Sequence, residues 1–196
     1  MPQFAARPKR NLALAAIARG LTLARVLGLP PFLWLLARVA AGAPLELRAS
    51  LGFAYLLLAL SDFFDGRLAR RAHATSPFWA RADVGADILF NFGSLAVAAR
   101  LGLLGPWVAA GVALLGGRFL WRSLRALGPD GSLPEDRAGK VAGVSYYLLV
   151  GWVVAELACG GLLGRFVLAR CGDAVFLYTL VAFWLGRARP MSSRVR

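Results

Sequence analysis

The chain has 196 residues, 59% of them hydrophobic, and a formal net charge of +13. A mean hydropathy of +0.62, together with several apolar stretches long enough to cross a bilayer, excludes a soluble globular domain. The excess of basic residues does not indicate nucleic acid as a partner, because these residues flank the apolar stretches and form no separate module. We therefore expect an integral membrane protein.

Six apolar stretches follow one another along the chain and occupy most of it. A helix needs roughly 20 mostly apolar residues to cross the bilayer, so we predict an all-α bundle of six transmembrane helices in a single domain over residues 1–196. A short interfacial helix is expected within residues 1–20, where leucines and basic residues recur at helical spacing. A basic cytoplasmic tail, residues 187–196, should follow the bundle. The predicted spans are residues 21–41, 49–64, 82–102, 104–121, 141–161 and 166–186.

The basic residues are distributed unevenly between the two ends of these helices. Five of the 23 Lys and Arg residues fall at one end, and the other eighteen fall at the opposite end. Loops rich in Lys and Arg stay cytoplasmic. We therefore expect a multi-pass protein of the cell membrane with both termini on the cytoplasmic side. The only cysteines, Cys159 and Cys171, fall near the outer ends of helices, where a disulfide and simple packing both fit. The five residues of the outer end are Arg38, Arg48, Arg100, Arg165 and Arg170.

A pair of aspartates stands at the predicted cytoplasmic end of the second span. Asp62 and Asp65 share one helical face with Gly66 and Ala69. Carboxylates within a membrane segment are costly and by default have a function. The two small residues leave room for a bulky group to approach the backbone on the same face.

A second pair, Asp83 and Asp87, shares one face at the start of the next span. Helices joined by a short loop are usually neighbours, so we expect these two helices to pack directly and the four carboxylates to meet. Clustered negative charge requires cations, and oxygen-only ligands favour Mg²⁺ or Mn²⁺. Two such ions suit a diphosphate substrate. Alternatively, the aspartates cap helices and pair with Arg67, Arg70, Arg71 and Arg81.

The spacing of these residues resembles the signature of the CDP-alcohol phosphatidyltransferase family, D-x2-D-G-x2-A-R, about eight residues, then G-x3-D-x3-D. Six helices, with the motif on the second and third, fit that family across nearly the whole chain. One position departs, because Trp79 stands where the family has its second glycine. Its indole would contact the substrate, anchor the helix at the membrane interface or block the site. The matching residues are Asp62, Asp65, Gly66, Ala69, Arg70, Asp83 and Asp87.

The resemblance implies a reaction and a metal centre. A phosphatidyl group would pass from CDP-diacylglycerol to an alcohol, with release of CMP. Two divalent cations, Mg²⁺ or Mn²⁺, would be held by Asp62, Asp65 and Asp83, with Asp87 completing the shell of the second ion. Asp87 is also the candidate general base, because the last carboxylate would face the entering alcohol. A homodimer is a further implication.

Substrate contacts follow from the same resemblance. Gly66 and Ala69 would admit the cytidine, Arg70 would contact phosphate, and Trp79 would stand near the nucleotide. Weaker similarities to a phosphatidylglycerophosphate-synthase-like branch favour glycerol 3-phosphate as the acceptor, ahead of inositol phosphate or another phospholipid. Basic residues would hold the acceptor's phosphate, although each would equally serve to set topology. They are Arg118, Arg122, Arg125 and Lys140.

Three other classes of protein share part of this pattern. A membrane prenyltransferase also uses paired aspartates, but more helices and differently spaced motifs are expected of it. A transporter would need a polar path, yet the only other acids in the predicted spans are Glu156 and Asp173, both toward the outer ends. A degenerate family member that binds lipid or a partner protein would explain Trp79, Ala142 and Gly143, which stand where the family has other residues.

Overall fold

The computed structural model describes residues 12–71, 77–125, 137–162 and 164–187. Within this part of the chain there are six α-helices and no strand, which confirms the all-α class. Cys159 and Cys171 are both free cysteines. The helices are α1 (Leu12–Ala40), α2 (Leu45–Arg71), α3 (Pro77–Arg100), α4 (Pro106–Arg125), α5 (Arg137–Cys159) and α6 (Arg165–Arg187).

The start of α1 differs from the prediction. The helix is continuous from Leu12 to Ala40 and includes Pro30 and Pro31, so residues 12–20 belong to the same helix as the first span. They do not form a separate interfacial helix, because within α1 no proline precedes Pro30 to interrupt the backbone hydrogen bonds. Residues 1–11 and 188–196, which include most of the predicted basic tail, lie outside the described residues.

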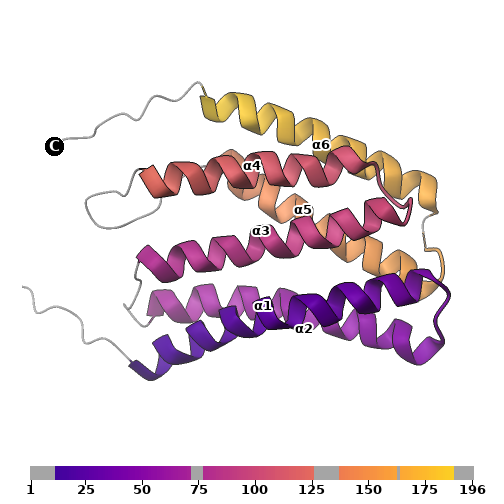
Figure 1. The fold of residues 1–196 in the computed structure, drawn as a ribbon, viewed down its shortest axis with the longest axis horizontal. Coiled ribbons are helices and arrows are strands. Elements are labelled where there is room, and N and C mark those ends of the chain that lie inside the picture. Colours follow the sequence, from indigo (N-terminus) through magenta and orange to yellow (C-terminus); the bar gives the residue numbers. More distant parts are fainter. Residues whose placement is uncertain (1–11, 72–76, 126–136, 163, 188–196) are drawn as a thin grey trace, which may run out of the picture.

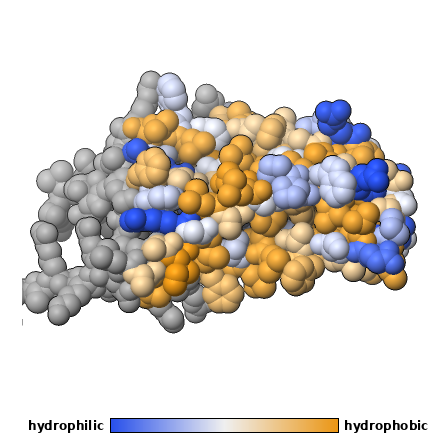
Figure 2. Space-filling view, turned by 60° about the horizontal axis from the view of Figure 1, so that its bottom comes forward, coloured by the Kyte–Doolittle hydropathy of each residue, from blue (hydrophilic) through white to orange (hydrophobic). Residues whose placement is uncertain are grey.

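Four of the described helices are long and apolar enough to cross a membrane. The face drawn in Figure 2 is hydrophobic over most of its middle, and strongly hydrophilic residues gather toward its ends. Both observations support a multi-pass membrane protein, while the count of six spans stays a prediction. The four candidate spans are Arg19–Ala40, Phe78–Arg100, Ala138–Cys159 and Arg165–Leu185.

The helices form an up-and-down bundle in which α1 begins and α6 ends at the same end (Figure 1). α5 packs against each of the other five helices, and α3 packs against α1, α4 and α5. The expectation that α2 and α3 pack directly is wrong, since the backbones of their described residues do not approach each other closely. Each packs on α1 and α5 instead.

Candidate active site

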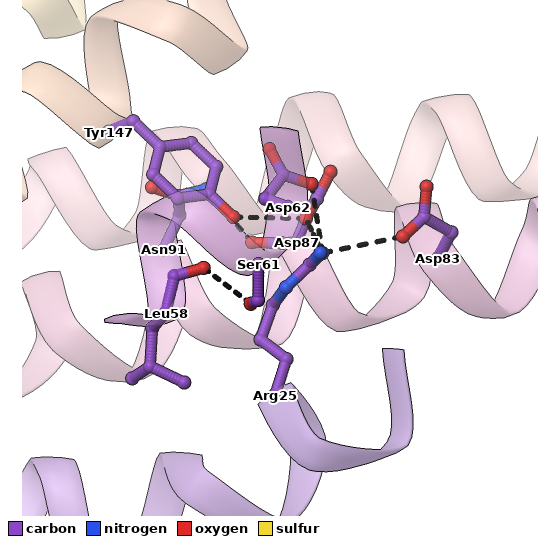
Figure 3. A network of polar contacts seen from close by, with 8 residues as sticks. All are labelled: Arg25, Leu58, Ser61, Asp62, Asp83, Asp87, Asn91 and Tyr147. Carbon is purple, nitrogen blue, oxygen red and sulfur yellow. Dashed lines mark hydrogen bonds and ion pairs between the residues drawn. The ribbon is translucent and has the colours of Figure 1, made fainter. Parts of the chain in front are cut away.

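A buried arginine on α1 joins carboxylates from two other helices (Figure 3). The side chain of Arg25 is 1% exposed, and its Nη1 atom lies 2.9 Å from Oδ1 of Asp62 on α2. The same nitrogen lies 3.4 Å from Oδ1 of Asp83 and 2.6 Å from Oδ1 of Asp87, both on α3. A charge at membrane depth is costly unless it is paired, so this cluster fixes where α1, α2 and α3 meet.

The three carboxylates form a donor set that suits a divalent cation. One oxygen from each of Asp62, Asp83 and Asp87 lies within 4.8 Å of the others. Only oxygen atoms are offered, and these are the donors that Mg²⁺ and Mn²⁺ prefer. The guanidinium of Arg25 shows that positive charge is stabilised at this point. The described residues therefore fit the predicted metal. Asp65 lies on the same helix as Asp62, with its side chain outside the described part.

Asp87 also accepts hydrogen bonds from a residue of α5 and from a residue one turn further along α3. The hydroxyl of Tyr147 donates to Oδ1 of Asp87 at 3.0 Å, and Nδ2 of Asn91 donates to the backbone carbonyl of Asp87 at 2.9 Å. The carbonyl of Tyr147 in turn accepts a hydrogen bond from the Tyr55 hydroxyl of α2 at 2.9 Å. A Cβ added at Gly151 would lie 2.5 Å from that hydroxyl. The absence of a side chain at Gly151 therefore leaves room for the hydrogen bond that connects α2 to the backbone of Tyr147.

A cavity of about 730 Å³ opens beside Asp62 and Asp87, a volume within the usual range for ligand sites. Three of the basic residues predicted to hold the acceptor's phosphate, Arg118, Arg122 and Lys140, line the same cavity. An anion held by these residues would therefore share one space with the carboxylates. The remaining lining residues are mostly apolar or small: Val84, Ile88, Asn91, Val112, Leu115, Gly116, Phe119, Gly139, Gly143, Val144, Tyr146 and Tyr147.

Arg118 contacts α6 as well as lining the cavity. Its Nη1 atom donates to the backbone carbonyl of Phe183, and its guanidinium lies 4.8 Å from the centre of the Phe183 ring. Arg118 therefore helps to pack α4 on α6 in addition to lining the cavity.

Besides Asp65, four predicted site residues are described only as members of their helices. Gly66, Ala69 and Arg70 lie in α2, and Arg125 is the last residue of α4. Their side chains lie outside the described part of the structure, so their roles stay predictions.

Trp79 lies near the start of α3 and is not among the residues that line the cavity. The guanidinium carbon of Arg19 lies 5.4 Å from the centre of its ring, within the range of a cation–π contact. The Phe78 ring meets it edge-on, with 5.5 Å between ring centres. The indole therefore connects the start of α3 to α1.

Replacing Trp79 with glycine is expected to leave the range of accepted alcohols unchanged and to lower stability by on the order of 1 kcal/mol, because a cation–π contact is lost. Trp79→Phe retains an aromatic face and should behave more like the parent protein. The measurements are CMP release with a panel of alcohols and thermal melting in detergent. A gain of turnover in Trp79→Gly would show instead that the indole restricts the site.

Arg25, Asn91 and Tyr147 belong to the site but not to the predicted set. A signal for two of them exists, because Arg25 and Asn91 are polar residues inside predicted spans, where such residues by default have a function. Nothing in the sequence marks Tyr147, since its contact depends on how α5 is rotated against α3.

Comparison with known proteins identifies the family. Residues 15–186 match the CDP-alcohol phosphatidyltransferase family. The chain is also similar to the cardiolipin synthase (CMP-forming) of Streptomyces coelicolor (strain ATCC BAA-471 / A3(2) / M145), with 42% identity over 78 residues. That match covers 38% of this chain and 34% of the relative, so it spans about a third of the length of the curated protein. No solved structure matches the chain. The family match runs from α1 to α6 and confirms the family predicted from the spacing of the aspartates, so the chain belongs to the CDP-alcohol phosphatidyltransferase family.

Proposed function

We propose that the protein transfers a phosphatidyl group from CDP-diacylglycerol to an alcohol, releases CMP and requires a divalent metal. The observation that carries this proposal is that Asp62 and Asp87 line the same cavity as Arg122 and Lys140. Carboxylates that suit a metal and basic side chains that suit a phosphate thus share one space. Membership of the family supports the same reaction.

The metal centre would consist of aspartates from α2 and α3. Asp62, Asp65, Asp83 and Asp87 would hold two divalent cations, Mg²⁺ or Mn²⁺. When bound, such ions neutralise charge on phosphorus oxygens and so favour attack on the donor's diphosphate.

The transfer itself is a substitution at phosphorus. The acceptor hydroxyl forms a bond to the phosphorus that carries the lipid, the bond to the CMP oxygen breaks, and CMP leaves with the electron pair. Asp87 would take the hydroxyl proton, and Tyr147, which donates to its Oδ1 atom at 3.0 Å, orients that carboxylate. Gly66 and Ala69 would admit the cytidine, and Arg70 would contact phosphate.

The basic residues of the cavity favour an acceptor that carries phosphate. Glycerol 3-phosphate is the first candidate, because a small dianion would fit beside Arg122 and Lys140. A phospholipid acceptor is the second candidate, and the similarity to a protein named as a CMP-forming cardiolipin synthase favours it. Both acceptors carry an anionic phosphate and a free hydroxyl, so only an assay with each separates them.

Replacing Arg122 with glutamine is expected to raise the KM for a phosphorylated acceptor by about tenfold to a hundredfold, since a hydrogen bond to a charged group contributes roughly 1.5–3 kcal/mol. Steady-state CMP release at varied acceptor concentration measures this. Uncharged glycerol serves as the internal control, because its turnover should hardly change. An equal loss with glycerol would contradict the assigned role.

Purified protein in detergent, supplied with CDP-diacylglycerol, tests the proposal most directly. CMP release should require Mg²⁺ or Mn²⁺ and an alcohol, and chelation with EDTA should stop it. Glycerol 3-phosphate, inositol phosphate and a glycerol-headed phospholipid are compared in parallel. Absence of CMP release with every acceptor and metal would support the degenerate, lipid-binding alternative.

The orientation of the protein in the membrane and its oligomeric state are part of the same proposal. The uneven distribution of Lys and Arg supports cytoplasmic termini, and the end of the bundle that carries Asp62 and Asp87 would then face the cytoplasm. The family supports a homodimer. Labelling of single introduced cysteines in intact cells and the mass of the purified particle test these two points.

A further inference from the structure

The contacts of Arg25 converge on one atom. Nη1 lies 2.6 Å, 2.9 Å and 3.4 Å from one oxygen on each of three carboxylates. These carboxylates belong to Asp62, Asp83 and Asp87, the residues whose oxygens lie close enough together to hold a metal ion. The nitrogen therefore lies where the three oxygens converge.

That position cannot hold the guanidinium and a divalent cation together. Mg²⁺ requires its oxygen ligands at about 2.0–2.1 Å, so an ion bound by the same three oxygens would be in contact with Nη1. Both groups are positive, and an arginine nitrogen offers no lone pair to a metal. In this arrangement, binding of the ion requires the guanidinium to withdraw.

The charge balance favours such an exchange. Arg25 brings one positive charge to three carboxylates, and the carboxylate side chains are only 31–33% exposed. Partly buried like charges repel strongly, so a divalent ion neutralises the cluster better than one arginine does. Arginine in turn suits the metal-free state, because it remains charged at all physiological pH values.

We propose that Arg25 is an exchangeable counter-cation of the metal centre. In the metal-free protein it holds the carboxylates of α2 and α3 together, and a divalent cation displaces it when the centre is loaded. The displaced guanidinium remains beside the site on α1, where the phosphates of the donor provide an anionic partner. This inference rests on the proposed function only in taking the carboxylate cluster as a metal site.

Binding of Mn²⁺ to the purified protein, followed by the electron paramagnetic resonance of free Mn²⁺, tests the exchange without any turnover. Arg25→Met should bind Mn²⁺ at least about tenfold more tightly than the parent protein, because the competing cation is gone. Arg38→Met is the matched control: Arg38 lies on the same helix, is exposed and lies over Trp34, so its removal should leave the affinity unchanged.

Thermal melting of the same variants provides the second measurement. In EDTA, Arg25→Met should melt at a lower temperature than the parent protein, and saturating Mn²⁺ should remove most of that difference. Arg25→Gln, which keeps a polar group near the carboxylates, should show the same pattern in milder form.

Two results would overturn the exchange. One is an unchanged or weaker Mn²⁺ affinity in a folded Arg25 variant. The other is failure of both Arg25→Met and Arg25→Gln to fold even with saturating Mn²⁺. Absence of Mn²⁺ binding by the parent protein would instead contradict the metal site of the proposed function. If the parent binds Mn²⁺ and releases CMP while Arg25→Met shows no gain in affinity, only the exchange fails.

Discussion

Replacement of Asp83 by asparagine is expected to abolish metal-dependent CMP release from CDP-diacylglycerol, with a loss of at least about a hundredfold. Replacement of a residue that only hydrogen-bonds to a metal ligand typically costs 10–100-fold in metal affinity or activity. Loss of a ligand itself should therefore cost more. The substitution keeps the size of the side chain. Arg25 also keeps its contacts to Asp62 and Asp87, at 2.9 Å and 2.6 Å, so the fold should persist. CMP release and Mn²⁺ affinity are the measurements.

Asp173→Asn is the matched control for this substitution. Asp173 lies at the opposite end of the bundle, where Oδ1 accepts a hydrogen bond from Trp107 at 2.9 Å and Oδ2 pairs with Arg170 at 3.1 Å. Removal of the Asp173 charge should leave CMP release within about twofold of the parent rate, because an exposed ion pair contributes little. Turnover by Asp83→Asn at the parent rate would remove Asp83 from the set of metal ligands.

Gly151→Ala is expected to destabilise the protein by about 1–3 kcal/mol, the usual cost of overpacking. The new Cβ would lie 2.5 Å from the Tyr55 hydroxyl and 2.9 Å from Cζ of the same ring, so the ring must move. That movement breaks the hydrogen bond from Tyr55 to the Tyr147 carbonyl and disturbs the tyrosine that contacts Asp87. Melting in detergent should show the loss of stability, and CMP release should fall with it.

Two comparisons isolate the cause of that loss. Gly52→Ala on α2 adds a Cβ that meets nothing within 4 Å, and alanine is favoured over glycine in a helix by roughly 0.5–1 kcal/mol, so this variant should be neutral or more stable. Tyr55→Phe removes the hydroxyl without a clash and should cost about 1 kcal/mol, the value of one hydrogen bond. If Gly151→Ala were as stable as Gly52→Ala, the close contact at Gly151 would not limit the packing of α2 on α5.

The sequence predicts the meeting of the carboxylates of α2 and α3, because these aspartates lie in a local motif. Asp83 and Asp87 share a face through helical periodicity alone. The apolar stretches also predict the six helices, although α1 begins nine residues earlier than its predicted span, at Leu12. The spacing between Asp65 and Arg70 is likewise independent of tertiary structure, which is why the family can be predicted from it.

The partners of these carboxylates could not be predicted, because the contacts depend on how the helices pack. Arg25 and Asp62 lie far apart in the sequence, on α1 and α2. The contacts of Arg25 with the aspartates of α2 and α3 require α1 to lie against both of these helices. The expected direct packing of α2 on α3 fails for the same reason, since short loops constrain distance but not which helix lies between. The Trp79 indole contacts Arg19 of α1. The spacing of residues within α3 cannot predict this contact, because the partner lies on another helix.

The contacts of Arg25 also have a consequence for biogenesis. α1 precedes the other five helices in the chain, and Arg25 lies six residues inside the candidate membrane span that begins at Arg19, or about 9 Å along the helix. An arginine inside the bilayer is unfavourable until it is neutralised, and its carboxylates arrive only with the end of α2 and the start of α3. We therefore expect α1 to reach its final depth only when the third helix has been inserted, so that the first three helices assemble as one cooperative unit.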